Sequence, residues 1–236
     1  MSASMSAVIE ISNAEKTFTM HLQGGVKLPV VRGVTFAVDP GECVVLSGPS
    51  GIGKSSILKM IFGNYRCDGG SIGVRHRGEM LDLAGAEPRE ILSVRRNTIG
   101  YVSQFLRAVP RVPTIDVVAE PLIVTGMQRS DARRHAEHLL RRLNIPERLW
   151  TLPPSTFSGG EQQRVNIAHG FISDYPILLL DEPTASLDAA NSAVVVDLIN
   201  EKKRAGVALV AIVHDDEIRR VIADRVVDVA AIAAAA

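Results

Sequence analysis

The alternation of apolar and polar positions divides the chain into short strands and helices. Residues 8–46 read as strands, and residues 69–83 read as a further strand or hairpin. Residues 99–104 are expected to return the chain to a central sheet. The segment 42–47 is apolar and β-branched, as a buried parallel strand should be. Apolar runs that read as strands also occupy residues 177–182 and 207–213.

Helical periodicity appears between and after these strands. Residues 105–165 contain few patterns typical of strands. Within them, residues 130–144 predict a helix, because an N-capping serine is followed by apolar residues at helical spacing. Residues 188–206 read as a capped helix with a glycine stop, and residues 226–236 as a late strand with a frayed, alanine-rich end. The arginines of the first of these helices are read as a solvated face or a docking surface: Arg133, Arg134, Arg141 and Arg142.

Composition narrows the class of protein. A chain of 236 residues with 46% hydrophobic residues can bury one sizeable core and a subdomain. Lysine plus arginine equals aspartate plus glutamate, at 26 each, which argues against a nucleic-acid partner. There is no run of 18 apolar residues and no signal peptide, so we expect a cytoplasmic protein without direct membrane insertion. Cys43 and Cys67 are isolated, which favours reduced thiols.

A glycine-rich loop between a predicted strand and a predicted helix is the first candidate binding site in the chain. GPSGIGKS fits the pattern G-x-x-x-x-G-K-[ST], whose backbone N–H groups cradle phosphates. Lys54 is expected to reach the β- and γ-phosphates, and the Ser55 hydroxyl to bind Mg²⁺. The alternative is a glycine-rich turn with an exposed lysine. The predicted nucleotide-binding residues are Gly48, Pro49, Ser50, Gly51, Ile52, Gly53, Lys54, Ser55 and Ser56.

Two adjacent carboxylates end the apolar run of residues 177–182. Because side chains alternate along a strand, Asp181 and Glu182 should point in different directions. Asp181 is the expected partner of Mg²⁺, and Glu182 is placed to polarise a water that attacks the γ-phosphate. The alternative is that both acids only cap a strand end before Pro183.

A Ser-Gly-Gly-Glu turn at residues 158–161 precedes this strand. Ser158 and Glu161 fit a capping box, in which each side chain binds the other residue's backbone N–H. The glycines Gly159 and Gly160 weaken a helix start by roughly 1 kcal/mol each relative to alanine. Bare backbone at a helix N-terminus suits the close approach of an anion, so we expect the cap to build an anion site.

These motifs, in this order, resemble those of the ATP-binding cassette (ABC) ATPases over nearly the whole chain. The resemblance implies an α/β fold: a phosphate-loop NTPase with a RecA-like parallel sheet, an antiparallel β subdomain and an α-helical subdomain. It implies ATP and Mg²⁺ as cofactors, with Ser55, Gln104 and Asp181 at the metal. Glu182, His214 and Gln104 would be the catalytic residues. Phe18 would stack on adenine, and Asp188 would help link the two sites of a dimer.

The family also implies that ATP lies between the phosphate loop of one cassette and the Ser-Gly-Gly turn of another. Each motif occurs once here, so the single ABC domain, residues 1–236, needs a second copy of itself or a related cassette. Residues 1–98 and 166–236 would form the nucleotide-binding core, and residues 99–165 the helical subdomain. The chain departs from the family with FSGGE in place of LSGGQ and with His169 in place of arginine.

Stretches outside the ATPase motifs resemble one subgroup, the cassette subunit of the bacterial carbon–phosphorus lyase system (the PhnL type). These stretches lie at residues 21–36, 103–126 and 143–192. The subgroup implies an ATPase that assists a soluble complex of lyase subunits in phosphonate catabolism. A second expectation is the ATPase subunit of a membrane transporter, in which the helical subdomain contacts a permease. A third is an ATP-dependent assembly scaffold.

Overall fold

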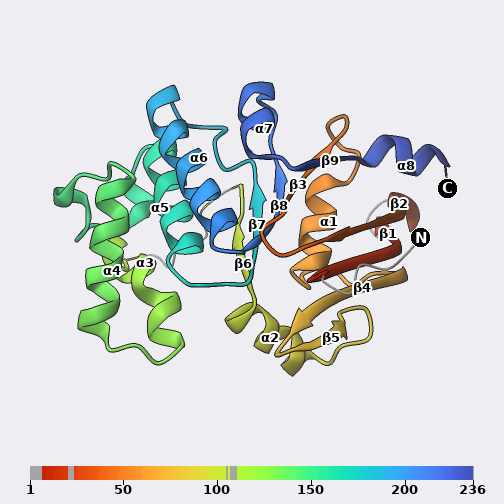
Figure 1. The fold of residues 1–236 in the computed structure, drawn as a ribbon, viewed down its shortest axis with the longest axis horizontal. Helices are drawn as coiled ribbons and strands as arrows, with labels where there is room; N and C mark the ends of the chain where they lie inside the picture. Colours follow the sequence, from red (N-terminus) through yellow and green to blue (C-terminus); the bar gives the residue numbers. More distant parts are fainter. Residues whose placement is uncertain (1–6, 21–23, 105, 107–110, 236) are drawn as a thin grey trace.

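The structure is a computed structural model that describes residues 7–20, 24–104, 106 and 111–235. Figure 1 shows a parallel sheet in the middle of the molecule, an antiparallel sheet at one end and the helices α3 and α4 at the other. The expected α/β fold class is therefore confirmed, with all three of its parts.

The central sheet has five parallel strands in the order β6-β7-β8-β3-β9. Strands β3 and β7 consist entirely of buried or nearly buried residues, because the sheet is covered on both faces. Its strands are β3 (Cys43–Ser47), β6 (Ile99–Val102), β7 (Ile177–Asp181), β8 (Ala208–Ile212) and β9 (Arg225–Asp228). The surrounding helices are α1 (Lys54–Ile61), α2 (Pro88–Asn97), α5 (Gly159–Phe171), α6 (Ala189–Arg204), α7 (Asp216–Ile222) and α8 (Val229–Ala235).

The second sheet is antiparallel, with the strand order β2-β1-β4-β5. Its strands are β1 (Ile9–Met20), β2 (Val26–Val38), β4 (Gly69–His76) and β5 (Glu79–Asp82). Strands β4 and β5 form the hairpin that the sequence predicts between residues 69 and 83. Helix α1 lies between this sheet and the parallel sheet, and its buried Ile57, Leu58 and Ile61 belong to the core that both sheets share.

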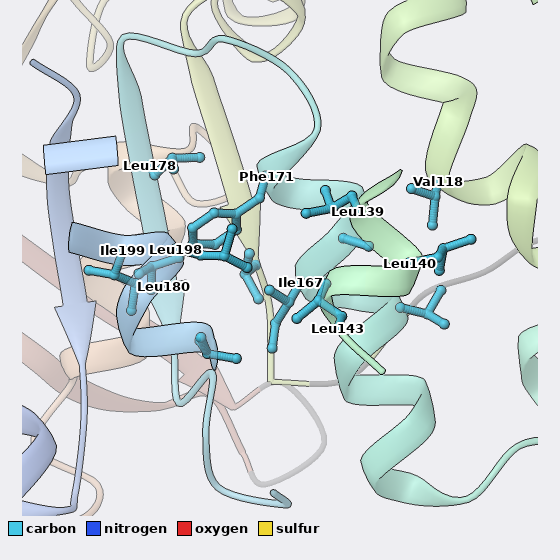
Figure 2. Close-up of a cluster of buried hydrophobic side chains, with 14 of the residues drawn as sticks. Val118, Leu139, Leu140, Leu143, Ile167, Phe171, Leu178, Leu180, Leu198 and Ile199 are labelled. Carbon is cyan, nitrogen blue, oxygen red and sulfur yellow. The ribbon is translucent and has the colours of Figure 1, made fainter. Parts of the chain in front are cut away.

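The helical subdomain consists of α3 (Thr114–Val124), α4 (Arg129–Arg142) and the short 3₁₀ turns η2 (Glu147–Leu149) and η3 (Pro154–Thr156). Figure 2 shows Leu140 of α4 and its C-cap residue Leu143 beside Ile167 of α5, with Leu178 and Leu180 of β7 further into the same cluster. The subdomain therefore shares a continuous apolar core with one face of the parallel sheet. The alternate residues of β7, Ile177 and Leu179, pack on the other face.

Two local predictions need correction. Helix α4 begins at Arg129 with Gln128 as its N-cap, so Ser130 lies inside the helix. The alanine-rich C-terminal segment forms α8, whose first N–H groups donate to the Asp228 side chain. The arginines of α4 lie on a solvated face, in agreement with one of the two predicted alternatives, since the side chains of Arg134 and Arg141 are 74% and 56% exposed. They also form ion pairs with carboxylates of neighbouring elements. Arg133 binds Asp116 and Arg142 binds Glu201, which ties α4 to α3 and α6.

Among the described residues, no helix combines the length and the apolar character that crossing a bilayer requires. Both cysteines are free and buried, in agreement with the prediction of reduced thiols. Burial raises the pKa of the Cys43 thiol to about 12, so this side chain behaves as an apolar group of the sheet.

Candidate nucleotide-binding site

The phosphate loop connects β3 to α1, as the motif requires. Gly53 is the N-cap residue of α1 and has φ 105°, a conformation that favours glycine. A Cβ atom at this position would lie 2.6 Å from the carbonyl oxygen of Val30 in β2. The antiparallel sheet therefore packs directly against the loop, and a glycine is required for steric as well as conformational reasons.

Lys54 is held inside the loop. Its Nζ donates to the carbonyl oxygens of Gly48 at 2.7 Å and Pro49 at 2.9 Å, and the residue is 8% exposed. Lys54 lines a cavity of about 210 Å³. Residues of the loop, Val30, Glu182 and His214 line this cavity. A cationic group beside bare loop backbone is suited to an anionic phosphate chain.

Asp181 and the Ser55 hydroxyl meet at the end of β7. Ser55 Oγ donates to Asp181 Oδ1 at 3.0 Å, although strand β8 lies between β3 and β7. Tyr101 Oη donates to Asp181 Oδ2 at 3.2 Å. Burial raises the pKa of the Asp181 carboxyl above its usual range, whereas the two hydroxyl donors lower it. The hydroxyl and the carboxylate are oxygen ligands that fit Mg²⁺, which takes few protein ligands in nucleotide sites.

Glu182 points away from Asp181, as predicted, and meets the other two candidate catalytic residues. His214 Nε2 lies 2.8 Å from Glu182 Oε1, and Gln104 Nε2 donates to Glu182 Oε2 at 3.4 Å. His214 follows β8 and Gln104 follows β6, so the strands on either side of β7 supply the partners of its carboxylate. Glu182 has φ 53°, an uncommon value for a residue other than glycine and one that is found at functional sites.

The Ser-Gly-Gly-Glu turn forms the expected capping box at the start of α5. Ser158 N donates to Glu161 Oε2 at 2.9 Å, and Glu161 N donates to Ser158 Oγ at 3.4 Å. A Cβ atom at Gly160 would lie 3.0 Å from the Ser186 carbonyl oxygen, whereas a Cβ atom at Gly159 would meet open space. Gly160 therefore makes room for a loop of the same chain, and Gly159 presents bare backbone to the outside.

Asp188 is the N-cap of α6. Its side chain accepts from Asn191 N at 2.8 Å, so the residue has a structural role within the chain. Phe18 lies outside the described lining of the phosphate-loop cavity and contacts Tyr65 edge-on, with ring centroids 5.1 Å apart. Its predicted stacking on adenine stays a prediction. The ammonium group of Lys16 lies 5.5 Å from the Phe18 ring centroid, a contact that the sequence pattern does not reveal.

The described lining of the 210 Å³ cavity includes no residue of the Ser-Gly-Gly-Glu turn. The two predicted anion-binding features, the phosphate loop and the turn, are therefore separate in the part of the chain that the structure describes. Sequence reasoning missed Tyr101 as a partner of Asp181. The alternation of side chains along β6 could have indicated this residue, because it places Tyr101 on the face of the sheet opposite to Val102.

The fold and this arrangement of residues define a phosphate-loop nucleotide triphosphatase. A family model described as ABC transporter matches residues 31–185, more than half of the chain. The lipoprotein-releasing system ATP-binding protein LolD of Maricaulis maris is 38% identical over 212 residues, which cover 89% of each chain. The chain belongs to the ABC transporter family and corresponds to its ATPase domain, whose cofactors are ATP and Mg²⁺.

Other relatives are longer. An uncharacterized ABC transporter ATP-binding protein of Mycobacterium tuberculosis is 36% identical over 88% of this chain, and the chain spans 61% of its length. The macrolide export ATP-binding/permease protein MacB of Marinobacter nauticus is 31% identical over 91% of this chain, which spans 32% of its length. Among solved structures, a dimeric post-hydrolysis state of the ATP-binding cassette MJ0796 with ADP and Pi has a TM-score of 0.84, 28% identity and 93% coverage of both chains.

Proposed function

We propose that this chain is the ATPase subunit of a membrane transporter and that it works as a head-to-tail dimer of cassettes at the cytoplasmic face of a permease. The observation that carries the proposal is the division of anion-binding features between the phosphate loop and the Ser-Gly-Gly-Glu turn. Because the turn does not line the phosphate-loop cavity, we infer that each part contacts only one side of a bound triphosphate. The dimeric cassette structures with the same fold support this arrangement.

The transporter function is favoured over the phosphonate-lyase function that the subgroup resemblance implies. Two of the relatives named above are ATP-binding proteins of a lipoprotein-releasing system and of macrolide export, and none of those named is described as a carbon–phosphorus lyase subunit. Partnership with lyase subunits therefore has only the sequence resemblance behind it. The contacts of Glu182 with His214 and Gln104 favour a hydrolysing enzyme over an assembly scaffold, because a scaffold does not need an oriented base.

The residues of one site divide the chemistry between them. Lys54 and the N-terminus of α1 would bind the phosphates. Ser55 and Asp181 would hold Mg²⁺, which would supply positive charge beside the phosphate oxygens. The Glu182 carboxylate would accept a hydrogen bond from the attacking water and thereby orient that water. His214 and Gln104 hold the Glu182 carboxylate in place. Ser158 of a second cassette would close the site over the γ-phosphate.

A groove between α2, α3 and α5 is the proposed contact for the permease, and we call it the α2–α3 groove. Cavities of about 320 Å³ and 680 Å³ adjoin there and share Leu92 and Arg95. Leu92 is 63% exposed and Val124 is 42% exposed, so the groove presents apolar surface to the solvent. Because the groove lies where β6 and the helical subdomain meet, an apolar segment seated in it would contact the elements that carry Gln104.

Purification of the tagged protein from native membranes tests the proposal. We expect a polytopic membrane protein to co-purify, and recovery of soluble lyase subunits without one would overturn the transporter function. Leu92→Asp should reduce recovery of the membrane protein at least about tenfold, since it places a charge in an apolar contact. The matched control is Val226→Asp, because Val226 is 47% exposed on the edge strand β9, away from the groove.

A further inference from the structure

The hydroxyl of Ser158 is already engaged within its own chain. Ser158 Oγ donates to Glu161 Oε2 at 2.7 Å, in addition to the two backbone contacts of the capping box. A serine hydroxyl has one proton to donate. Donation to an ionised carboxylate is charge-assisted and roughly twice as strong as donation to a neutral acceptor. The bond therefore competes with any other acceptor for the same proton.

The carboxylate that accepts this bond is firmly ionised. Hydrogen bonds from Ser158 lower the pKa of the Glu161 carboxyl below its usual range, and the charges of Arg164 and Arg148 lower it further. Glutamate at this position thus places a full negative charge at the start of α5. In the proposed sandwich, the γ-phosphate of the opposing nucleotide would approach the same turn, where Gly159 leaves the backbone open.

From this geometry we propose that Glu161 is a positioning residue that competes with the γ-phosphate of the opposing ATP for the Ser158 hydroxyl proton. The competition raises the ATP concentration at which two cassettes close. The inference rests on the ATP sandwich proposed above and adds a regulatory threshold to it. In the separate cassette the hydroxyl turns inward to Glu161, and closure requires that it turn outward to the phosphate.

The experiment measures ATP-driven dimerisation of the purified cassette in a Glu182→Gln background, by light scattering during gel filtration across a range of Mg-ATP concentrations. Adding Glu161→Gln keeps a residue that completes a capping box but replaces the charged acceptor with a neutral one. We expect the ATP concentration at half-closure to fall about tenfold, which corresponds to about 1.4 kcal/mol. An unchanged midpoint would overturn the proposal.

A second comparison separates the hydroxyl from simple charge repulsion. In the Ser158→Ala background there is no proton to compete for, so Glu161→Gln should shift the midpoint by less than about threefold. A tenfold shift in both backgrounds would show that charge alone acts and would overturn the competition. Failure of every variant to dimerise would instead remove the sandwich itself, and with it this inference.

Helix α2 offers a matched control, because it begins with a second capping box. Glu87 N donates to Glu90 Oε2 at 2.8 Å, so Glu90→Gln makes the same chemical change at another helix start. We expect Glu90→Gln to leave the dimerisation midpoint unchanged, and a fall equal to that of Glu161→Gln would refute a specific role. In the protein with Glu182 intact, Glu161→Gln should lower KM for ATP about tenfold with little change in kcat.

Discussion

Replacement of Gly53 by alanine tests how tightly the phosphate loop is packed. Gly53 has φ 105°, and holding an L-residue in such a conformation costs about 1–3 kcal/mol. The added methyl group would lie 2.6 Å from the Val30 carbonyl oxygen and 3.1 Å from Val31 Cγ2. Overpacking of this kind adds about 1–3 kcal/mol. Since the nearest atom is backbone of β2, relief requires a shift of the strand, and we expect a total loss of about 2–6 kcal/mol.

Gly51 supplies the matched control in the same loop. It has φ 81°, and a Cβ atom there would have no neighbour within 4 Å. Gly51→Ala should therefore show only the conformational loss of about 1–3 kcal/mol. Urea unfolding of the nucleotide-free protein, followed by circular dichroism, measures both variants without any contribution from ATP binding. Equal destabilisation by the two substitutions would refute the steric contribution of β2.

Three further predictions concern the site itself. Glu182→Gln should trap a closed, ATP-loaded dimer, and nucleotide release as fast as in the parent protein would show that Glu182 is not the base. Lys54→Ala should abolish high-affinity ATP binding in equilibrium titration, since the charge beside the loop carbonyls is lost; an unchanged affinity would contradict the phosphate assignment. Tyr101→Phe removes a hydrogen bond that favours the ionised form of Asp181, so the pKa of Asp181 rises and Mg-ATPase activity is lost at a higher pH on acidification. The test is the pH dependence of kcat/KM. If activity falls at the same acidic pH in the variant as in the parent protein, this role of Tyr101 is contradicted.

The sequence predicted the phosphate loop, the two carboxylates and the capping box, because each depends on residues close together in the chain. The loop needs glycines before Lys54, and the box needs Ser158 and Glu161 three residues apart. Gln104 and His214 were expected as catalytic residues only through the family resemblance, and their place beside Glu182 follows from neighbouring parallel strands that end at one edge of the sheet. The missed contacts join segments far apart in the chain, as in the pair of Arg142 with Glu201.

Local chemistry alone therefore determined that this protein binds a triphosphate with Mg²⁺, since a short motif dictates its own backbone conformation. Only the tertiary structure decided the burial and the hydrogen-bond partners of the residues in the site. The burial of Asp181 and its contact with Tyr101 depend on the packing of β6 beside β7. The steric need for Gly53 depends on β2, and the need for Gly160 depends on the loop that carries Ser186. Such contacts arise from the folding of distant segments onto one core, and no spacing along the chain encodes their distances.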